Sequence, residues 1–198
     1  MKKESIFILV LTLIFAVACK GEKKETETNT DYDEVEKAEG KSETTTSKAK
    51  LISVTLESKS NSNVTGTVTF TQEGDNITMV AIISGLSEGY HAIHLHEKAD
   101  CSSDDGKSSG GHWNPTAQPH GKWGAAEGFH QGDIGNFEAD ADGNGSITFT
   151  SDQWCIGCGD DTKDILGKAV IVHEGTDDFK SQPSGAAGTR ISCGGVIQ

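Results

Sequence analysis

The sequence predicts an all-β domain. Short runs of alternating apolar and polar residues recur along the chain, which is the period-two pattern of half-buried strands. No stretch keeps apolar residues at helical spacing for three turns, and the 24 glycines favour tight turns over helices. No unit of about 20 to 50 residues repeats, which argues against solenoids and propellers.

Seven runs carry the strand pattern and are separated by Gly, Asn, Asp and Ser. They span residues 51–57, 64–71, 77–83, 92–96, 146–150, 168–173 and 190–197. Segments 73–76 and 141–144 predict hairpin turns, because Gly and Asn tolerate the positive φ that such turns require. Between Glu97 and Gly135 the alternation almost disappears. A loop of this length in a compact domain usually needs something that orders it.

The N-terminus predicts an export signal. A basic start is followed by an apolar run, 6–17, that is too short to span a bilayer, and the small residue Ala18 precedes Cys19. This pattern is typical of a bacterial lipoprotein signal peptide over residues 1–18, with Cys19 as the lipidated residue. The alternatives are an ordinary signal peptide cut nearby and a single membrane anchor. On the first interpretation a lipid anchor attaches the protein to the membrane of the cell envelope, facing the periplasm or the outside.

Residues 19–50 predict the lipidated Cys19 followed by a disordered tether. The segment is rich in Glu, Lys, Thr and Ser, and Tyr32 and Val35 are its only aromatic and β-branched aliphatic residues. Such a composition cannot bury a core. Residues 51–198 are enough for one domain with its own core and too few for two ordinary ones.

The chain is acidic, with a formal net charge of −13, and loss of residues 1–18 leaves −14. This charge argues against nucleic acid as a partner. It would also repel an anionic substrate, so any anion-consuming activity needs a local cationic feature at its site.

Four cysteines remain besides Cys19, and an even number in an exported protein predicts two disulfides. Sequence distance favours Cys155 with Cys158 and Cys101 with Cys193, although four cysteines allow three pairings. A C-x-x-C pair is also found in redox motifs and metal sites. Because no βαβ unit or second such pair accompanies it here, we expect a disulfide that stiffens a loop.

All seven histidines fall between positions 91 and 173. His94 and His96 lie two residues apart on a predicted strand, so both rings face one side and are suited to chelating one ion. Two solvated histidines on a surface strand are the alternative. The other ligand candidates are His112, His120, His130, Asp133 and His173.

Without His91, the set contains six histidines and Asp133, as many ligands as two four-coordinate ions need when they share one. Imidazole suits copper and zinc, and a carboxylate with three imidazoles suits a closed tetrahedral zinc site. Of the two ions, copper would then be the redox-active one, because zinc does not change its oxidation state. His91 stands at odd spacing from His94, which predicts a buried structural histidine that faces away from the pair.

Five motifs resemble, in order, those of the copper/zinc superoxide dismutases. They are HLHE at 94–97, GHWNP at 111–115, HQGDIGN at 130–136, VHE at 172–174 and GTRISCG at 188–194. The resemblance covers roughly residues 51–198. It implies an eight-stranded Greek-key β-barrel with an immunoglobulin-like sandwich architecture, whereas periodicity alone indicates only an all-β fold.

The resemblance also implies a metal role for each ligand candidate. The copper ligands would be His94, His96, His112 and His173, and the zinc ligands would be His112, His120, His130 and Asp133. His112 would therefore bridge the two ions. Asp177 resembles the carboxylate that links a copper histidine to a zinc histidine and fixes both rings. The alternative for Asp177 is a solvated loop acid.

Arg190 resembles the family's cationic guide beside the copper, and it would supply what the acidic surface lacks. A surface ion pair is the alternative. Cys101 and Cys193 resemble the family's disulfide. Two features depart from the family pattern. Residues 155–164 resemble an insertion that the family does not require. The segment between His173 and Arg190 is short compared with the animal members of the family, and Lys180 is its only Lys or Arg, so we expect the electrostatic steering of an anion to be weaker or differently arranged.

The function implied by the resemblance is the disproportionation of superoxide into dioxygen and hydrogen peroxide, with Arg190 and His112 as catalytic residues. A non-catalytic periplasmic copper/zinc-binding module is the alternative, although it leaves Arg190 unexplained. A structural envelope lipoprotein would leave the whole ligand set without a purpose. The sequence does not decide between a monomer and a homodimer.

Overall fold

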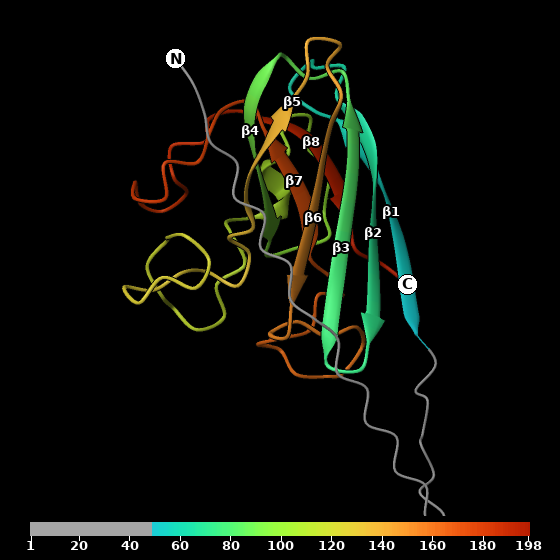
Figure 1. The fold of residues 1–198 in the computed structure, drawn as a ribbon, viewed down its shortest axis with the longest axis vertical. Coiled ribbons are helices and arrows are strands. Elements are labelled where there is room, and N and C mark those ends of the chain that lie inside the picture. The colour runs from blue at the N-terminus through green and yellow to red at the C-terminus, as the bar shows by residue number, and fades with distance from the viewer. Residues whose placement is uncertain (1–48) are drawn as a thin grey trace, which may run out of the picture. The chain divides into compact units, whose positions relative to one another are not determined.

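Eight antiparallel strands close into a barrel in the computed structural model, which describes residues 49–198 (Figure 1). The strands are β1 (Lys50–Ser58), β2 (Thr65–Glu73), β3 (Asn76–Ser84), β4 (Gly89–His96), β5 (Gly135–Ala139), β6 (Gly145–Ser151), β7 (Ala169–His173) and β8 (Arg190–Gly195). A 3-10 turn, η1 (Lys107–Ser109), is the only helical element in this part of the chain. Within residues 49–198 no helix is long and apolar enough to cross a membrane. The predictions for the signal peptide, Cys19 and nearly all of the tether lie outside the described residues.

The strand order around the barrel is β1-β2-β3-β6-β5-β4-β7-β8. Two connections, β3 to β4 and β6 to β7, skip intervening strands, which gives the Greek-key pattern. Pairing is sparse at two seams: β5 meets β6 only at Ala139 and Gly145, and β1 meets β8 at two residue pairs. The barrel is therefore two four-stranded sheets joined at their edges, which confirms the predicted Greek-key barrel with sandwich architecture.

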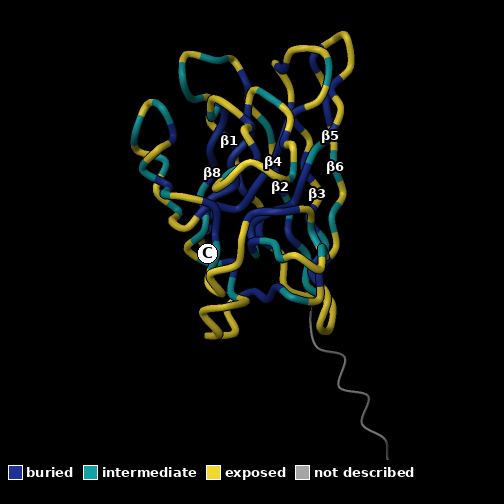
Figure 2. Tube along the Cα trace, turned by 90° about the vertical axis from the view of Figure 1, so that its left-hand side faces the viewer, coloured by how far each residue is buried: buried dark blue, intermediate teal, exposed yellow. Residues whose placement is uncertain are grey.

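The core forms because β1, β2 and β3 alternate between buried and exposed residues, so one face of each strand points inward. Phe70, Met79 and Leu56 are among its largest fully buried side chains. In contrast, β4 and β7 are buried at almost every position (Figure 2). Loops cover the outer face of these two strands, and the strand histidines lie beneath them.

Both predicted hairpin turns are present. Glu73 pairs with Asn76 across the first, Ala139 pairs with Gly145 across the second, and Gly143 takes a φ of 77° in the latter. Strand β5 did not emerge from the alternation pattern, because its five residues bring only Phe137 and Ala139 inward as apolar side chains. A strand this short carries too little alternation to be distinguished from the loop before it.

Two long loops project from the barrel on the same side in Figure 1. One spans 97–134 and the other 174–189, and both pack over the β4 and β7 side of the barrel. A third segment, 152–168, lies at the end of the barrel where β6 stops. Disulfides join Cys101 to Cys193 and Cys155 to Cys158, as expected from sequence distance.

Candidate metal centre

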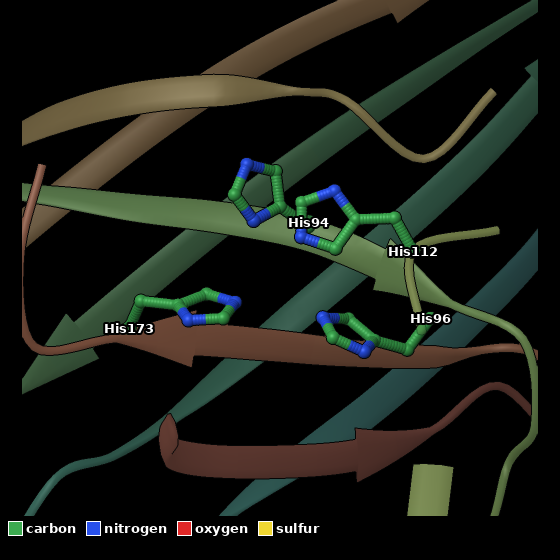
Figure 3. Close-up of side chains that lie close together, drawn as sticks. All are labelled: His94, His96, His112 and His173. Carbon is green, nitrogen blue, oxygen red and sulfur yellow. The ribbon is translucent and has the colours of Figure 1, made fainter. Parts of the chain in front are cut away.

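Three histidines are held by the barrel itself. His94 and His96 project from the same face of β4, and His173 ends the adjacent strand β7, where a register shift sets it opposite Arg190 of β8. Figure 3 shows these rings and that of His112 directed toward one another. Their candidate ligand atoms all lie within 4.8 Å of one another. The structure therefore brings together the four histidines predicted for copper.

A second set lies in the long loop and includes His112 again. His120, His130 and Asp133 complete it, and all four residues are buried. The Asp133 carboxylate stands 2.8 Å from Nδ1 of His112, 3.0 Å from that of His120 and 3.2 Å from that of His130. Metal–nitrogen bonds of about 2.0–2.1 Å would place the ligand atoms of a tetrahedron about 3.3 Å apart, which is close to these separations.

Ring nitrogens that lack a hydrogen-bond partner indicate which atom of each histidine is free to bind a metal ion. Six buried ring nitrogens have no hydrogen-bond partner within residues 49–198: His94 Nδ1, His96 Nε2, His112 Nε2 and His173 Nε2 in the first set, and His120 Nδ1 and His130 Nδ1 in the second. An unpaired buried polar atom costs free energy, so native proteins satisfy nearly all of them. Six orphaned nitrogens converging on two points fit two bound cations.

The opposite ring nitrogens of several ligands are held by other groups. Nδ1 of His96 donates to the Gly110 carbonyl at 3.0 Å. Asp177 is buried and accepts from Nε2 of His94 and from Nε2 of His120, each at 2.9 Å. Asp177 is thus a buried residue that joins the two sets and not a solvated loop acid.

Burial shifts the protonation of the first set toward neutral imidazole. It lowers the pKa of His96 and of His173 well below the ordinary value, and neighbouring histidines lower both further. The pKa of His94 is also lowered by burial, against the opposing effect of Asp177. Burial brings the pKa of His112 down to about 4, although Asp133 opposes the shift. These rings are in the neutral form that binds metal.

The second set has the opposite electrostatic character. Burial opposes the charged form of His120, but the carboxylates of Asp133 and Asp177, which lie 3.0 and 2.9 Å from its ring nitrogens, outweigh it and raise its pKa to about 9. Burial likewise opposes ionisation of the two carboxylates, yet hydrogen bonds from histidines lower the pKa of each well below its usual range. This half of the centre therefore carries negative charge that attracts a cation.

Two adjoining clefts lead from the surface to the histidines, and Arg190 lines both. One, of about 370 Å³, also contains His96, His173 and Lys107, and the other, of about 350 Å³, contains His112. The Arg190 guanidinium donates to the Gly106 carbonyl and to Ser109 Oγ, and no carboxylate within residues 49–198 forms an ion pair with it. The predicted alternative of a surface ion pair is therefore not observed.

His91 is buried apart from both sets, as predicted. Its Nδ1 lies 3.0 Å from the His173 carbonyl and its Nε2 lies 2.9 Å from the Ser87 carbonyl. It thereby ties β4 to the end of β7 behind a candidate ligand.

Two residues of the centre were not singled out from the sequence. Asn136 exchanges two hydrogen bonds with the backbone of Asp177, at 2.8 and 2.9 Å, and so fixes that carboxylate. Gly185 has a φ of 65°, and a Cβ there would overlap the Asp177 carboxylate. The position of Asn136 within the 130–136 motif could have indicated a role at the site. Nothing in the sequence around Gly185 indicates that it lies next to Asp177.

Comparisons with known proteins agree with this geometry. The family model described as "Copper/zinc superoxide dismutase (SODC)" matches residues 64–197. The extracellular Cu-Zn superoxide dismutase of Caenorhabditis elegans is 36% identical over 137 residues, which are 66% of this chain and 60% of the nematode protein. This chain therefore matches less than two thirds of the length of that relative.

Solved structures of a SOD-like protein from Bacillus subtilis are also similar. A double mutant of that protein is 31% identical, with a TM-score of 0.66, and the match covers 74% of this chain and 97% of the bacterial one. A single mutant is 30% identical, with the same TM-score and the same coverage. With the family model matching most of the chain, the barrel and both ligand sets in place, this chain belongs to the copper/zinc superoxide dismutase family.

Proposed function

We propose that this protein disproportionates superoxide, so that two superoxide ions and two protons give one dioxygen and one hydrogen peroxide. The main support is the position of Arg190 in the cleft with His96 and His173. The guanidinium lowers the pKa of both rings, after burial and neighbouring histidines, which means that it disfavours positive charge there. A site that only stores metal cations would be weakened by this residue, whereas a site that receives an anion is strengthened by it.

His94, His96, His112 and His173 would hold copper, and His112, His120, His130 and Asp133 would hold zinc. Bound there, copper would supply one-electron redox chemistry, and zinc, which has none, would supply positive charge and order in the loop. The orphaned nitrogens and the separations around Asp133 support this assignment. His112 is the residue shared by both sets.

The residues of the chain would then bind the substrate, orient the ligands and move protons. Arg190 attracts the anion and orients it through N–H groups whose direction is fixed by Gly106 and Ser109. His112 lines the adjoining cleft and would hold a proton at Nε2, from which the nascent peroxide takes it. Asp177 keeps His94 and His120 in orientation.

Pulse radiolysis of the chain loaded with one copper and one zinc tests this function. We expect fast superoxide decay that His173→Ala abolishes and that Arg190→Ala slows by about tenfold or more, because local attraction of an anion contributes at least this factor. Decay no faster than in the His173→Ala protein, at full metal occupancy, would favour the metal-binding module instead.

We also propose that the protein is exported and attached to the bacterial cell envelope by lipid on Cys19. The 1–19 pattern supports this, and the two disulfides and the relative named as extracellular support an oxidising compartment. Fractionation of expressing cells should find the chain in the membrane fraction and a Cys19→Ser variant outside it. Equal membrane association of both would exclude lipid on Cys19 as the anchor.

A further inference from the structure

The segment between β6 and β7, residues 152–168, folds back on itself into a unit that we term the brace loop. The Cys155–Cys158 disulfide closes its first half, and the backbone of Cys155 exchanges hydrogen bonds with the second half, at Lys163 and Ile165. The Asp164 carboxylate accepts three backbone N–H groups of the same loop, from Gly157, Gly159 and Leu166. The loop is thus held by its own contacts.

The brace loop is fixed to the barrel at its end. Ile156 and Ile165 are buried in the core, together with Trp154. The Ile156 N–H donates to Gln72 Oε1 at 2.8 Å, and Lys50 donates to the Ile156 carbonyl at 2.6 Å. Movement of the loop relative to β1 and β2 would therefore break buried contacts.

Trp154 connects this fixed loop to the proposed zinc ligands. Its indole Nε1 donates to the Gln131 carbonyl at 2.9 Å, and the Gln131 side chain donates to Gln153 at 3.1 Å. Gln131 directly follows His130 and stands two residues before Asp133. The Trp154 bond therefore restrains the backbone that carries these two ligand side chains, and the Gln153 bond holds the side chain of Gln131.

Aromatic rings also link Trp154 to the part of the long loop that precedes His130. The Trp154 ring lies 5.7 Å from that of Trp123, and Trp123 lies 4.8 Å from Phe129, which precedes His130. Phe149 of β6 packs against both tryptophans, at 5.0 and 5.1 Å. The long loop is thus held on the barrel by a cluster to which the brace loop contributes Trp154.

We propose that the brace loop is a positioning device for the zinc half of the centre, acting through Trp154 on Gln131 and hence on His130 and Asp133. This inference rests on the zinc site proposed above. Within residues 49–198 the strand-held histidines have no hydrogen bond to Trp154 or Gln131, and the ladders of β4, β7 and β8 fix them instead. His112, the copper ligand from the long loop, is joined to β4 by its backbone pairing with His96. Loss of the brace therefore lowers the affinity for zinc and spares the affinity for copper.

The most specific test of this role is the Trp154→Phe variant, which keeps an aromatic ring and removes the N–H donor to the Gln131 carbonyl. Trp123→Phe is the matched control, since it makes the same replacement in the same cluster, at an indole with no hydrogen bond within residues 49–198. Dissociation constants of the full chain for zinc and for copper are measured by competition with a chromophoric chelator. The absorption spectrum of Co²⁺ placed in the zinc site reports ligand geometry independently of turnover.

We expect Trp154→Phe to raise the dissociation constant for zinc by about threefold to tenfold, the value of one hydrogen bond, and to shift the Co²⁺ spectrum. Trp123→Phe should retain the wild-type constant and spectrum, and copper binding should stay within about twofold in both. A double variant, Cys155→Ser with Cys158→Ser, opens the loop without touching Trp154 and should weaken zinc binding in the same direction. It tests the brace even if Trp154→Phe fails to fold.

Unchanged zinc binding in Trp154→Phe and in the double serine variant would overturn the positioning role of the brace loop, while the proposed zinc site would be unaffected. Equal weakening of zinc and copper would also overturn it, because that result indicates general destabilisation. A wild-type chain that takes up no zinc would overturn the zinc site itself, and the brace with it.

Discussion

The two halves of the metal centre are built from different kinds of structure. His94, His96 and His173 stand on adjacent strands, where ladder hydrogen bonds fix the backbone. His120, His130 and Asp133 stand on a loop, where position depends on contacts such as those of the Asp133 carboxylate with the backbone N–H groups of Gly121 and His130. The barrel therefore preorganises the copper half, whereas the zinc half needs additional ordering groups.

The halves also differ in charge. In the strand-held half, burial lowers the pKa of each histidine, so the rings are neutral. In the loop-held half, Asp133 and Asp177 stay ionised and raise the pKa of His120 to about 9. A bound cation would satisfy this charge, and in the metal-free protein a proton on His120 partly takes its place.

The largest expected effect comes from removing one ligand of each half. His96→Ala should lower copper affinity by at least about 100-fold and zinc affinity by less than about threefold, and Asp133→Asn should do the reverse. Asp133→Asn should also make the long loop more sensitive to protease, because the carboxylate holds the N–H groups of Gly121 and His130. Chelator competition and limited proteolysis provide the measurements. If either variant weakened both metals equally, the halves would not be independent.

Besides His112, which both sets share, Asp177 should be an exception to that independence, since it hydrogen-bonds one histidine of each half. Asp177→Asn should weaken both metals, by about 10-fold to 100-fold, as expected for a carboxylate that orients ligand histidines. The matched control is Asp178→Asn, because Asp178 is adjacent and exposed, and its side chain accepts hydrogen bonds only from Lys180 and Ser181 of its own turn. Measurable loss with Asp178→Asn, or loss of a single metal with Asp177→Asn, would contradict the linking role.

The sequence predicted the strand-held half more completely than the loop-held half. The spacing of His94 and His96 fixes their common face, because side chains on a strand alternate. The long loop has no such period, so its residues could be grouped only by counting ligands and by family resemblance. The contacts of Trp154 with Gln131 and of Asn136 with Asp177 were not predictable, because each joins segments more than twenty residues apart without a shared pattern.

Opposite pH dependence of the two halves is expected in the metal-free chain. Burial lowers the pKa of His112 to about 4 and that of His96 well below its usual value, so the unfolded chain binds protons more readily than these folded rings do. The free energy of unfolding should therefore fall as pH drops from about 6.5 toward 4. The raised pKa of His120 has the reverse sign. Its contribution is fully present below about pH 6.5 and is lost as pH rises through about 9.

Urea unfolding of the metal-free chain at about pH 4.5, 6.5 and 9.5 measures both slopes. His96→Gln should reduce the acid slope and leave the alkaline slope, whereas His120→Gln should remove the alkaline decline contributed by that ring. If His120→Gln retained the full alkaline decline, the carboxylates would not be holding a proton on His120. These changes in the free energy of unfolding should be smaller than the losses of metal-binding free energy, because each depends on the binding of one proton.

The smallest effect is expected at the mouth of the copper-side cleft. The segment before Arg190 supplies little positive charge, but Lys107 of η1 lines the cleft from the other loop and pairs with Asp105 at 2.9 Å. Both side chains are exposed, so solvent screens the pair and the two charges largely cancel at a distance. Lys107→Gln should therefore slow superoxide decay by about twofold at low salt, and Asp105→Asn should accelerate it by a similar factor. Both differences should vanish at about 0.5 M salt, where charges more than a few ångströms apart are screened. A Lys107→Gln effect that persisted at high salt would place this side chain in direct contact with the substrate and not in long-range attraction.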